Sequence, residues 1–204
     1  MIKVENISKK FNDIVALNHV TFMIPSSKRV VLQGPSGSGK TTLLRLIAGL
    51  DNPTSGKIIK DEEKISFAFQ NDLLLEELNV YQNIAYGLYH RLYSKEEIDK
   101  KVRNISSLFL CDSYLNQKTS TLSGGQKQRI SLARALISQP DLLCIDEAFN
   151  SLDKDLRIDL IQKIIDIQQK TGMTILYVSH DQWDAKIMGE MFITLENGQI
   201  KNID

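Results

Sequence analysis

The sequence predicts an α/β fold, in which strands and helices alternate and a helical segment interrupts a mostly parallel sheet. Short apolar runs, namely "RVVLQ" (29–33), "DLLCIDE" (141–147) and "TILYVS" (174–179), have the length and composition of strands buried on both faces. Longer stretches with helical spacing separate these runs. The chain has 204 residues, which suits one large domain or a core with a subdomain.

The first third of the chain is rich in predicted strands. In "HVTFMI" (19–24) apolar residues alternate with others, and the polar "PSSK" (25–28) then turns the chain into the strand at 29–33. A helix is expected over "KTTLLRLIAGL" (40–50), ending near Gly49. "NPTSG" (52–56) has the composition of a turn, and "KISFAF" (64–69) predicts a strand that ends at Gln70.

Residues 73–138 are predicted to be helical, so the expected division is a core of residues 1–72 and 139–204 with a helical subdomain between them. Ser94 and Glu97 have the spacing of a capping box, and helical periodicity follows to about residue 110. Further helices are expected over residues 122–138 and 153–172, the second stopped by Gly172. Near the end, the Asn-Gly pair of "ENGQI" (196–200) predicts a tight hairpin.

Composition and charge exclude several classes of protein. Lysine and arginine (25) balance aspartate and glutamate (25), so no basic field points to nucleic acid. Cys111 and Cys144 lie too far apart in sequence for a metal or redox motif, and both are expected in the core. We find no signal peptide and no apolar run near the ~20 residues of a membrane-spanning helix.

"GPSGSGKT" (34–41) has the pattern of a phosphate-binding loop between a buried strand and a helix. Its glycines let successive N–H groups face phosphate oxygens, and the helix end adds a partial positive charge. Lys40 is expected on the β- and γ-phosphates and Thr41 on Mg²⁺. The alternative is a glycine-rich turn. The residues predicted to bind ATP are Gly34, Pro35, Ser36, Gly37, Ser38, Gly39, Lys40, Thr41 and Thr42.

Polar residues at three strand ends are predicted to complete a catalytic site. Asp146 is expected to hold the magnesium shell, and Glu147 to deprotonate the attacking water. Gln70 and His180 also follow strands, and in a parallel sheet such ends converge on the ligand crevice. Gln70 would contact the water or the metal and His180 the γ-phosphate. A structural polar role is the alternative for each.

Two further features of the sequence, Phe11 and residues 122–126, are also predicted to take part in nucleotide binding. Phe11 lies in a polar stretch before the sheet and would stack on adenine, or simply cover the sheet edge. "LSGGQ" (Leu122, Ser123, Gly124, Gly125 and Gln126) predicts a second helix start with a capping box and bare N–H groups. Because one nucleotide needs only one such cradle, we expect this signature segment (122–126) to contact the nucleotide of a second copy of the chain.

These motifs resemble, over essentially the whole chain, the nucleotide-binding subunit of ATP-binding cassette (ABC) transporters. "GPSGSGKT" resembles Walker A, Gln70 the Q-loop, "LSGGQ" the signature, "LLCIDE" Walker B, "NSLD" (150–153) the D-loop and "SHD" (179–181) the H-loop. The resemblance implies a P-loop NTPase fold with a RecA-like core, a small antiparallel N-terminal β part and a helical subdomain. It also places Phe11 on adenine and makes Asp153 a contact across the interface of the dimer.

The resemblance further implies a homodimer, or a pair with a similar cassette, that encloses two ATP molecules and drives integral membrane subunits. Residues 72–81 would border the groove for those subunits, at the cytoplasmic face of the membrane. Only 13 residues separate Gly56 from Gln70, a trimmed arm that resembles importers of nitrate, sulfonate and taurine-like solutes, which use a solute-binding protein. The alternatives are a small exporter and a soluble ABC ATPase outside transport.

Overall fold

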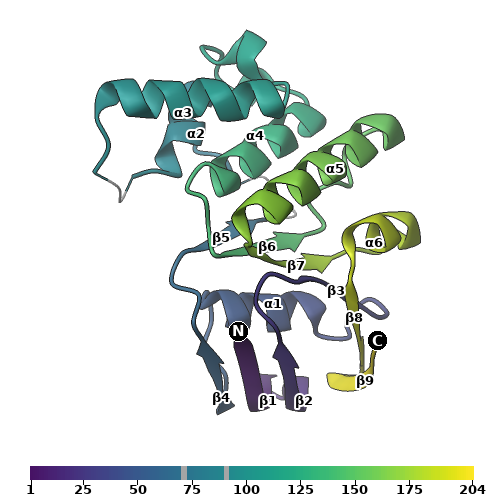
Figure 1. Cartoon of the computed structure of the whole chain (residues 1–204). Helices are drawn as coiled ribbons and strands as arrows, with labels where there is room; N and C mark the ends of the chain where they lie inside the picture. The colour runs from purple at the N-terminus through teal and green to yellow at the C-terminus, as the bar shows by residue number, and fades with distance from the viewer. Residues whose placement is uncertain (70–72, 90–91) are drawn as a thin grey trace.

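A computed structural model describes residues 1–69, 73–89 and 92–204 and confirms the α/β fold (Figure 1). Within these residues the strands form a six-stranded sheet, in the order β5-β6-β7-β3-β8-β9, and a three-stranded sheet, in the order β2-β1-β4. The strands are β1 (Ile2–Phe11), β2 (Ile14–Ile24), β3 (Arg29–Gln33), β4 (Ser55–Lys60), β5 (Ile65–Ala68), β6 (Leu142–Asp146), β7 (Thr174–Val178), β8 (Met191–Glu196) and β9 (Gln199–Ile203).

Helices cover both faces of the larger sheet. Figure 1 shows α1 between the two sheets, and α4 and α5 on the opposite face of the larger one. The helices are α1 (Lys40–Ala48), α2 (Val80–Tyr86), α3 (Lys95–Leu108), α4 (Gly124–Leu136), α5 (Lys154–Thr171) and α6 (Gln182–Met188), with 3₁₀ turns at Asp112–Tyr114 and Thr119–Thr121. None of the helices in the described ranges has the length and apolarity that crossing a membrane requires.

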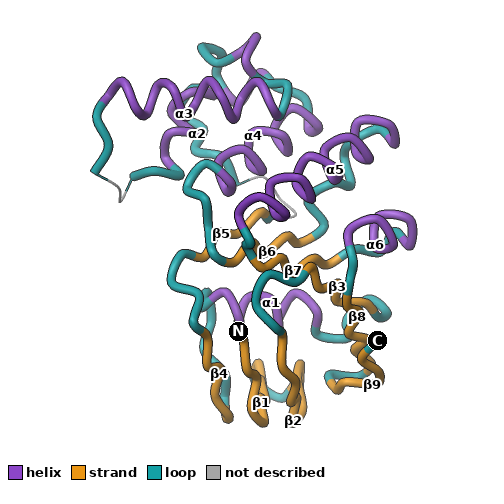
Figure 2. The backbone as a smooth tube through the Cα atoms, in the orientation of Figure 1, coloured by secondary structure: helices purple, strands orange, loops and turns teal. Residues whose placement is uncertain are grey.

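The larger sheet is parallel from β5 to β8, and only β9 runs antiparallel to its neighbour. Figure 2 shows its strands, in orange, below the helices α4 and α5. The β8–β9 hairpin turns at Asn197 and Gly198, whose φ angles are +49° and +75°. Two successive positive φ values are what a tight two-residue turn requires, and Asn-Gly supplies them. The predicted hairpin is therefore confirmed.

The central strands are buried on both faces, and their alternate side chains enter two separate hydrophobic clusters. In β3, Val31 packs with the helices α4 and α5, whereas Val30 and Leu32 pack with α1 and the smaller sheet. Strands β6 and β7 divide in the same way. A shift of one residue in register would exchange the two sets of side chains, so the register is firmly set. The carboxyl ends of β3, β6 and β7 consequently lie along one edge.

Several predicted elements are confirmed in detail. β3 occupies residues 29–33 as expected, and α1 and α5 end at Gly49 and Gly172, both in the left-handed conformation that favours glycine. Ser94 caps α3 in a complete capping box with Glu97. Both cysteines are buried, as predicted.

Other predictions were wrong or incomplete. Phe11 does not precede the sheet, because it is the last residue of β1, a strand that was missed since it is largely polar and irregular in register. Ser55 and Gly56, predicted to lie in a turn, begin β4. The short helix α6 was also missed. Gln70 lies outside the described residues, and the division of the chain at residues 73 and 138 stays a prediction.

An ionic network joins α5 to α6 and supports the segment that carries His180. Arg157 Nη1 lies 3.3 Å from Oδ2 of Asp181 and 3.3 Å from Oδ2 of Asp184. Tyr177 OH donates a hydrogen bond to the same oxygen of Asp184 at 3.4 Å. The Asp184 side chain is buried, and burial raises the pKa of its carboxyl while Arg157 opposes this shift. Arg157 thus compensates a buried negative charge.

We predict that Arg157→Ala lowers the free energy of unfolding by about 3 kcal/mol at pH 7, because it leaves the Asp184 carboxylate buried without its cation. The variant raises the pKa of Asp184 further. The folded state then holds a proton that the unfolded state has lost, so stability falls as the pH rises through this window. Urea unfolding at pH 5 and pH 7 measures the loss, which should be smaller at pH 5. Adding Asp184→Asn should recover stability at pH 7, and an equal loss at both pH values would contradict the prediction.

Candidate active site

The loop between β3 and α1 adopts a shape that requires glycine at two positions. Gly34 has φ +137° and Gly39 has φ +100°, which other residues rarely adopt. A Cβ atom on Gly34 would lie 2.0 Å from the carbonyl oxygen of Leu195, and one on Gly39 would lie 2.6 Å from that of Ala16. The loop thus fits tightly against β8 and β2 and leads into α1, whose first N–H groups have no partner within the helix.

Lys40, the first residue of α1, turns its side chain back over this loop. Its Nζ donates hydrogen bonds to the carbonyl oxygens of Gly34, at 2.9 Å, and Pro35, at 2.8 Å. Burial lowers the pKa of its ammonium group, and the carboxylates of Glu147 and Asp146 oppose that shift. The lysine and the helix N-terminus together make this end of the sheet attractive to an anion.

Thr41 and Asp146 bring two oxygen atoms together at the end of β6. Asp146 is the last residue of this strand, and Thr41 Oγ1 donates a hydrogen bond to its Oδ1 at 3.2 Å. Burial raises the pKa of the Asp146 carboxyl, the hydroxyl of Thr41 lowers it, and the neighbouring Glu147 raises it. A cation bound here would stabilise the ionised form of Asp146.

Glu147 and His180 meet across the ends of β6 and β7, as the sequence predicts for polar residues at strand ends. His180 Nε2 lies 2.6 Å from Glu147 Oε1. Glu147 has φ +49°, an uncommon conformation for a residue other than glycine, and its N–H donates to Val178 O at 3.1 Å. Backbone in such regions is often found at functional sites, because the surrounding structure must hold it there.

Lys40, Thr41, Glu147 and His180 line a pocket of about 480 Å³, and Asp146 contacts this lining through Thr41. Its lining combines apolar residues of β2, residues of the phosphate loop (34–41) and the contacting pair Glu147 and His180. The lining residues are Ile14, Val15, Ala16, Ser36, Gly37, Gly39, Lys40, Thr41, Thr42, Glu147 and His180. Such a pocket, with an apolar wall next to a cationic helix end, has the character of a nucleotide site.

Phe11 lies outside the lining of this pocket. Its ring is exposed, and the ammonium group of Lys9 lies 4.7 Å from the ring centroid. The exposed apolar residues that do line the pocket are Ile14 and Val15, at the start of the neighbouring strand β2. An apolar surface is therefore available for an adenine base. The structure adds Ile14 and Val15 to Phe11, the residue that the sequence indicated.

The signature segment begins α4 with the predicted capping box. Ser123 Oγ accepts a hydrogen bond from Gln126 N at 3.3 Å, and Gln126 Oε1 accepts one from Ser123 N at 2.9 Å. Gly124 is exposed, whereas Leu122 is buried. Among the described residues that line the pocket, none comes from this segment. The two glycine-rich helix starts of one chain are therefore not brought together.

The remaining predicted residues occupy different positions. Gln70 lies outside the described residues. Asp153 caps α5, since its Oδ1 accepts a hydrogen bond from Leu156 N at 3.0 Å, and its side chain is exposed at the start of that helix. The exposed position of Asp153 leaves its carboxylate open to a partner molecule as well as to its own helix.

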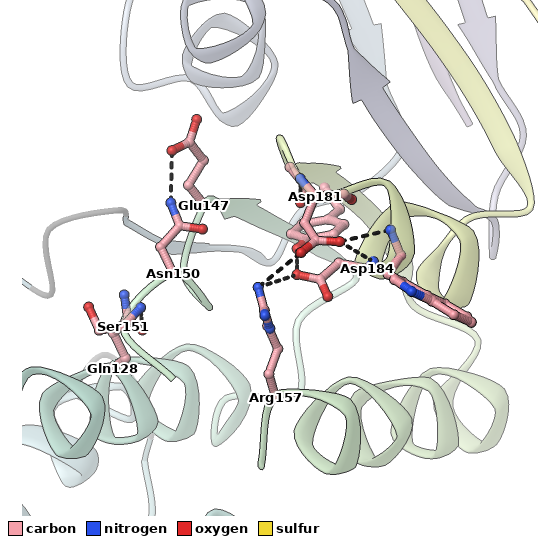
Figure 3. Close-up of polar contacts among 10 residues, drawn as sticks. Gln128, Glu147, Asn150, Ser151, Arg157, Asp181 and Asp184 are labelled. Atoms are coloured by element: carbon pink, nitrogen blue, oxygen red, sulfur yellow. Dashed lines mark hydrogen bonds and ion pairs between the residues drawn. The ribbon is translucent and has the colours of Figure 1, made fainter. Parts of the chain in front are cut away.

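Sequence reasoning missed two polar residues that contact this machinery. Asn150 Nδ2 donates to Glu147 Oε2 at 3.0 Å, and Gln128 Oε1 accepts from Ser151 N at 3.1 Å (Figure 3). The three-residue spacing between Glu147 and Asn150 within a loop could have suggested the first contact. No local pattern indicates the second, because 23 residues separate its partners.

Comparisons with known proteins agree with this geometry. A family model described as "ABC transporter" matches residues 17–150, which is more than half of the chain. Two solved structures of MJ0796, described as a bacterial ABC transporter cassette, are similar over 100% of this chain and 98% of theirs. One is a dimer in a post-hydrolysis state bound to ADP and Pi, with 30% identity and a TM-score of 0.94. The other, also dimeric, has 31% identity and a TM-score of 0.93. The chain therefore belongs to the ABC transporter family, as one of its ATPase cassettes.

Proposed function

We propose that this protein is the ATP-hydrolysing subunit of a membrane transporter, working as a dimer whose two copies enclose two ATP molecules. The observation that carries the proposal is the pocket at the end of the parallel strands. There residues of the phosphate loop and a contacting glutamate–histidine pair line the same space, and a buried aspartate, Asp146, contacts one of the lining residues, Thr41. Each part matches a separate requirement of phosphoryl transfer to water.

ATP binding would use the loop backbone and Lys40 for the phosphates. The backbone N–H groups of residues 36–42 and the ammonium group of Lys40 supply donors and positive charge where the phosphates would lie. The base would lie on the apolar side of the pocket, against Ile14, Val15 and Phe11. When an adenine base stacks on an aromatic ring or packs on aliphatic side chains, apolar surface is removed from water, and this burial stabilises the complex.

The residues present also fit Mg²⁺. The Thr41 hydroxyl and the Asp146 carboxylate are hard oxygen ligands 3.2 Å apart, and burial raises the pKa of the Asp146 carboxyl, a shift that a bound cation would oppose. The described residues contain no group of three or more His, Cys, Asp or Glu suited to a metal. Mg²⁺ needs only one or two protein oxygens when phosphates complete its shell, and it would neutralise developing charge on them. Thr41, Asp146 and Gln70 would be its neighbours.

Hydrolysis would depend on Glu147 and His180. The Glu147 carboxylate would accept a proton from the attacking water, and His180 would donate a hydrogen bond to the γ-phosphate. In the structure His180 Nε2 instead contacts Glu147 Oε1 at 2.6 Å. The histidine would therefore exchange this partner for a phosphate oxygen, which frees one carboxylate oxygen for water. Gln70 would help to orient that water.

The signature segment would complete the site of the other copy. Ser123 and the N–H groups of Gly124 and Gly125 would contact the γ-phosphate held by the partner's phosphate loop, with Asp153 at the same interface. Support comes from the separation of the two helix starts in one chain and from the dimers formed by MJ0796. In a dimer with two-fold symmetry, each ATP site would receive the phosphate loop of one copy and the signature segment of the other.

Coupling to transport would use the surface around residues 73–89. Leu73, Tyr86 and Tyr89 are exposed there, and the rings of Tyr86 and Tyr89 stack at 5.4 Å. Exposed apolar side chains near one another favour a protein partner. We assign this partner as an integral membrane subunit, which would hold the chain at the cytoplasmic face. Import with a solute-binding protein is the direction favoured by the short arm between β4 and β5.

We predict that Glu147→Gln reduces ATP hydrolysis at least ~100-fold and traps an ATP-bound dimer, because binding survives while water activation fails. Steady-state phosphate release and size-exclusion chromatography with Mg²⁺ and ATP measure the two effects. Glu63→Gln, an exposed carboxylate in the loop after β4, is the matched control and should behave like the parent. Hydrolysis by Glu147→Gln at the parental rate would exclude Glu147 as the base.

The in-trans arrangement predicts a specific result for mixed dimers. Neither Lys40→Ala nor Ser123→Arg should hydrolyse ATP alone, since each disables both composite sites of a homodimer. Mixing them should restore activity, because the mixed dimer keeps one site with an intact phosphate loop and an intact signature. The assay is phosphate release from mixtures in which differently tagged subunits are shown to co-purify. Mixed dimers no more active than either variant would contradict the arrangement.

The transport role predicts a membrane partner. We expect the tagged chain, purified from detergent-solubilised membranes of its source cell, to bring a multi-span membrane protein in stoichiometric amount, identified by mass spectrometry. A solute-binding protein in the same complex would support import, and its absence together with a single fused membrane protein would favour a small exporter. Exclusively soluble partners would contradict transport and favour an ABC ATPase of another process.

A further inference from the structure

Lys9, near the end of β1, has an ammonium group that is enclosed by other groups of the protein. Its Nζ donates one hydrogen bond to Asp51 Oδ1 at 2.7 Å and another to Asn52 O at 2.8 Å. The same nitrogen lies over the ring of Phe11, 4.7 Å from its centroid. Only 12% of the Lys9 side chain is exposed, although lysine usually extends its ammonium group into water. Three different groups thus hold this lysine in one position.

This arrangement fixes the ring of Phe11 from one side. A cation over an aromatic ring is attracted by the negative charge of the ring face, and the attraction is stronger where water is excluded. Asp51 keeps the Lys9 cation in place and compensates its charge. The Phe11 ring therefore has a defined orientation, while 47% of the residue remains exposed. The side of the ring that Lys9 does not cover is available to a planar ligand.

Phe11 also lies next to the apolar wall of the pocket. It is the last residue of β1 and pairs with Ile14, the first residue of β2, across the turn at Asn12 and Asp13. Ile14 and Val15 line the pocket. A ring that is held at this position extends the apolar surface on which the proposed function places the base.

Asp51 connects this aromatic position to the phosphate loop. It lies just beyond the carboxyl end of α1, the helix that begins at Lys40 in the phosphate loop. The segment after Asp51 is bonded to β1 as well, because Thr54 N donates a hydrogen bond to Ser8 O at 2.8 Å. One continuous helix therefore has the phosphate loop at its start and, at its end, the contacts that hold the strand carrying Phe11. The distance between the two is set before a nucleotide binds.

We propose that Lys9 and Asp51 are positioning residues that hold Phe11 for stacking on the base of the nucleotide. This inference rests on the proposed function, in which Phe11 contacts the adenine of ATP. The pair orders the Phe11 ring before ATP binds, so binding does not cost the freedom of that side chain. Among the described residues that line the pocket, neither Lys9 nor Asp51 is found. The pair should therefore affect the affinity for ATP and not the rate of hydrolysis.

The test uses calorimetric titration with Mg²⁺–ATP and with Mg²⁺–tripolyphosphate, which has the phosphates but no base. Lys9→Met keeps an unbranched side chain but removes its charge, and it should weaken ATP binding roughly threefold to tenfold. Tripolyphosphate binding and kcat should keep their parental values. Asp51→Asn should also weaken ATP binding, because it removes the charge that holds Lys9. Lys10→Met, which removes an exposed charge from the same strand, is the matched control and should bind both ligands like the parent.

A double variant tests whether Lys9 acts through Phe11. Phe11→Ala should weaken ATP binding by itself, and adding Lys9→Met should cause no further loss, because the ring that Lys9 orients is gone. Multiplied losses in the double variant would overturn the inference. So would an equal loss of tripolyphosphate binding, or parental ATP affinity in both Lys9→Met and Asp51→Asn. If the parental protein binds ATP no more tightly than tripolyphosphate, the base contact in the proposed function is contradicted instead.

Discussion

The burial of β3, β6 and β7 on both faces is the constraint on which the rest of the structure depends. Alternate side chains of these strands enter two different hydrophobic clusters, so neither a rotation nor a slip of one strand is tolerated. The carboxyl ends of the strands are consequently aligned. The phosphate loop, Asp146 and His180 leave the sheet at that edge. Thr41 therefore contacts Asp146, which lies 105 residues away in the sequence, and His180 contacts Glu147.

The parts of the fold that could be predicted are those with a local physical cause. The apolar runs of β3, β6 and β7, the capping box of Ser94 and the terminating Gly172 are all visible in short windows of sequence. β1 and β4 were missed because polar residues occupy much of both strands, and their pairing with each other is what identifies them as strands. α6 has only seven residues, too few for a helical period to be recognised.

The residues of the candidate site likewise fall into those that could be predicted from the sequence and those that could not. Lys40 and Thr41 were predicted from the phosphate-loop pattern, and Asp146, Glu147 and His180 from their positions at or just beyond the end of a buried strand. The contacts of Asn150, Gln128 and Arg157 could not be predicted, since their geometry depends on how α4, α5 and α6 pack against the D-loop and the end of β7. Ile14 and Val15 joined the pocket for a related reason, because the smaller sheet brings β2 beside the phosphate loop.

The two hydrogen bonds from Lys40 to the carbonyl oxygens of Gly34 and Pro35 have a kinetic consequence. The Lys40 side chain holds the curved phosphate loop through these two hydrogen bonds, so the loop keeps its shape before a nucleotide binds. A phosphate that binds must then replace the two hydrogen-bond partners of the Lys40 side chain, but it does not have to order a segment of backbone. Little conformational entropy is lost in that exchange, and association is expected to be fast, with selectivity expressed mainly in the rate of release.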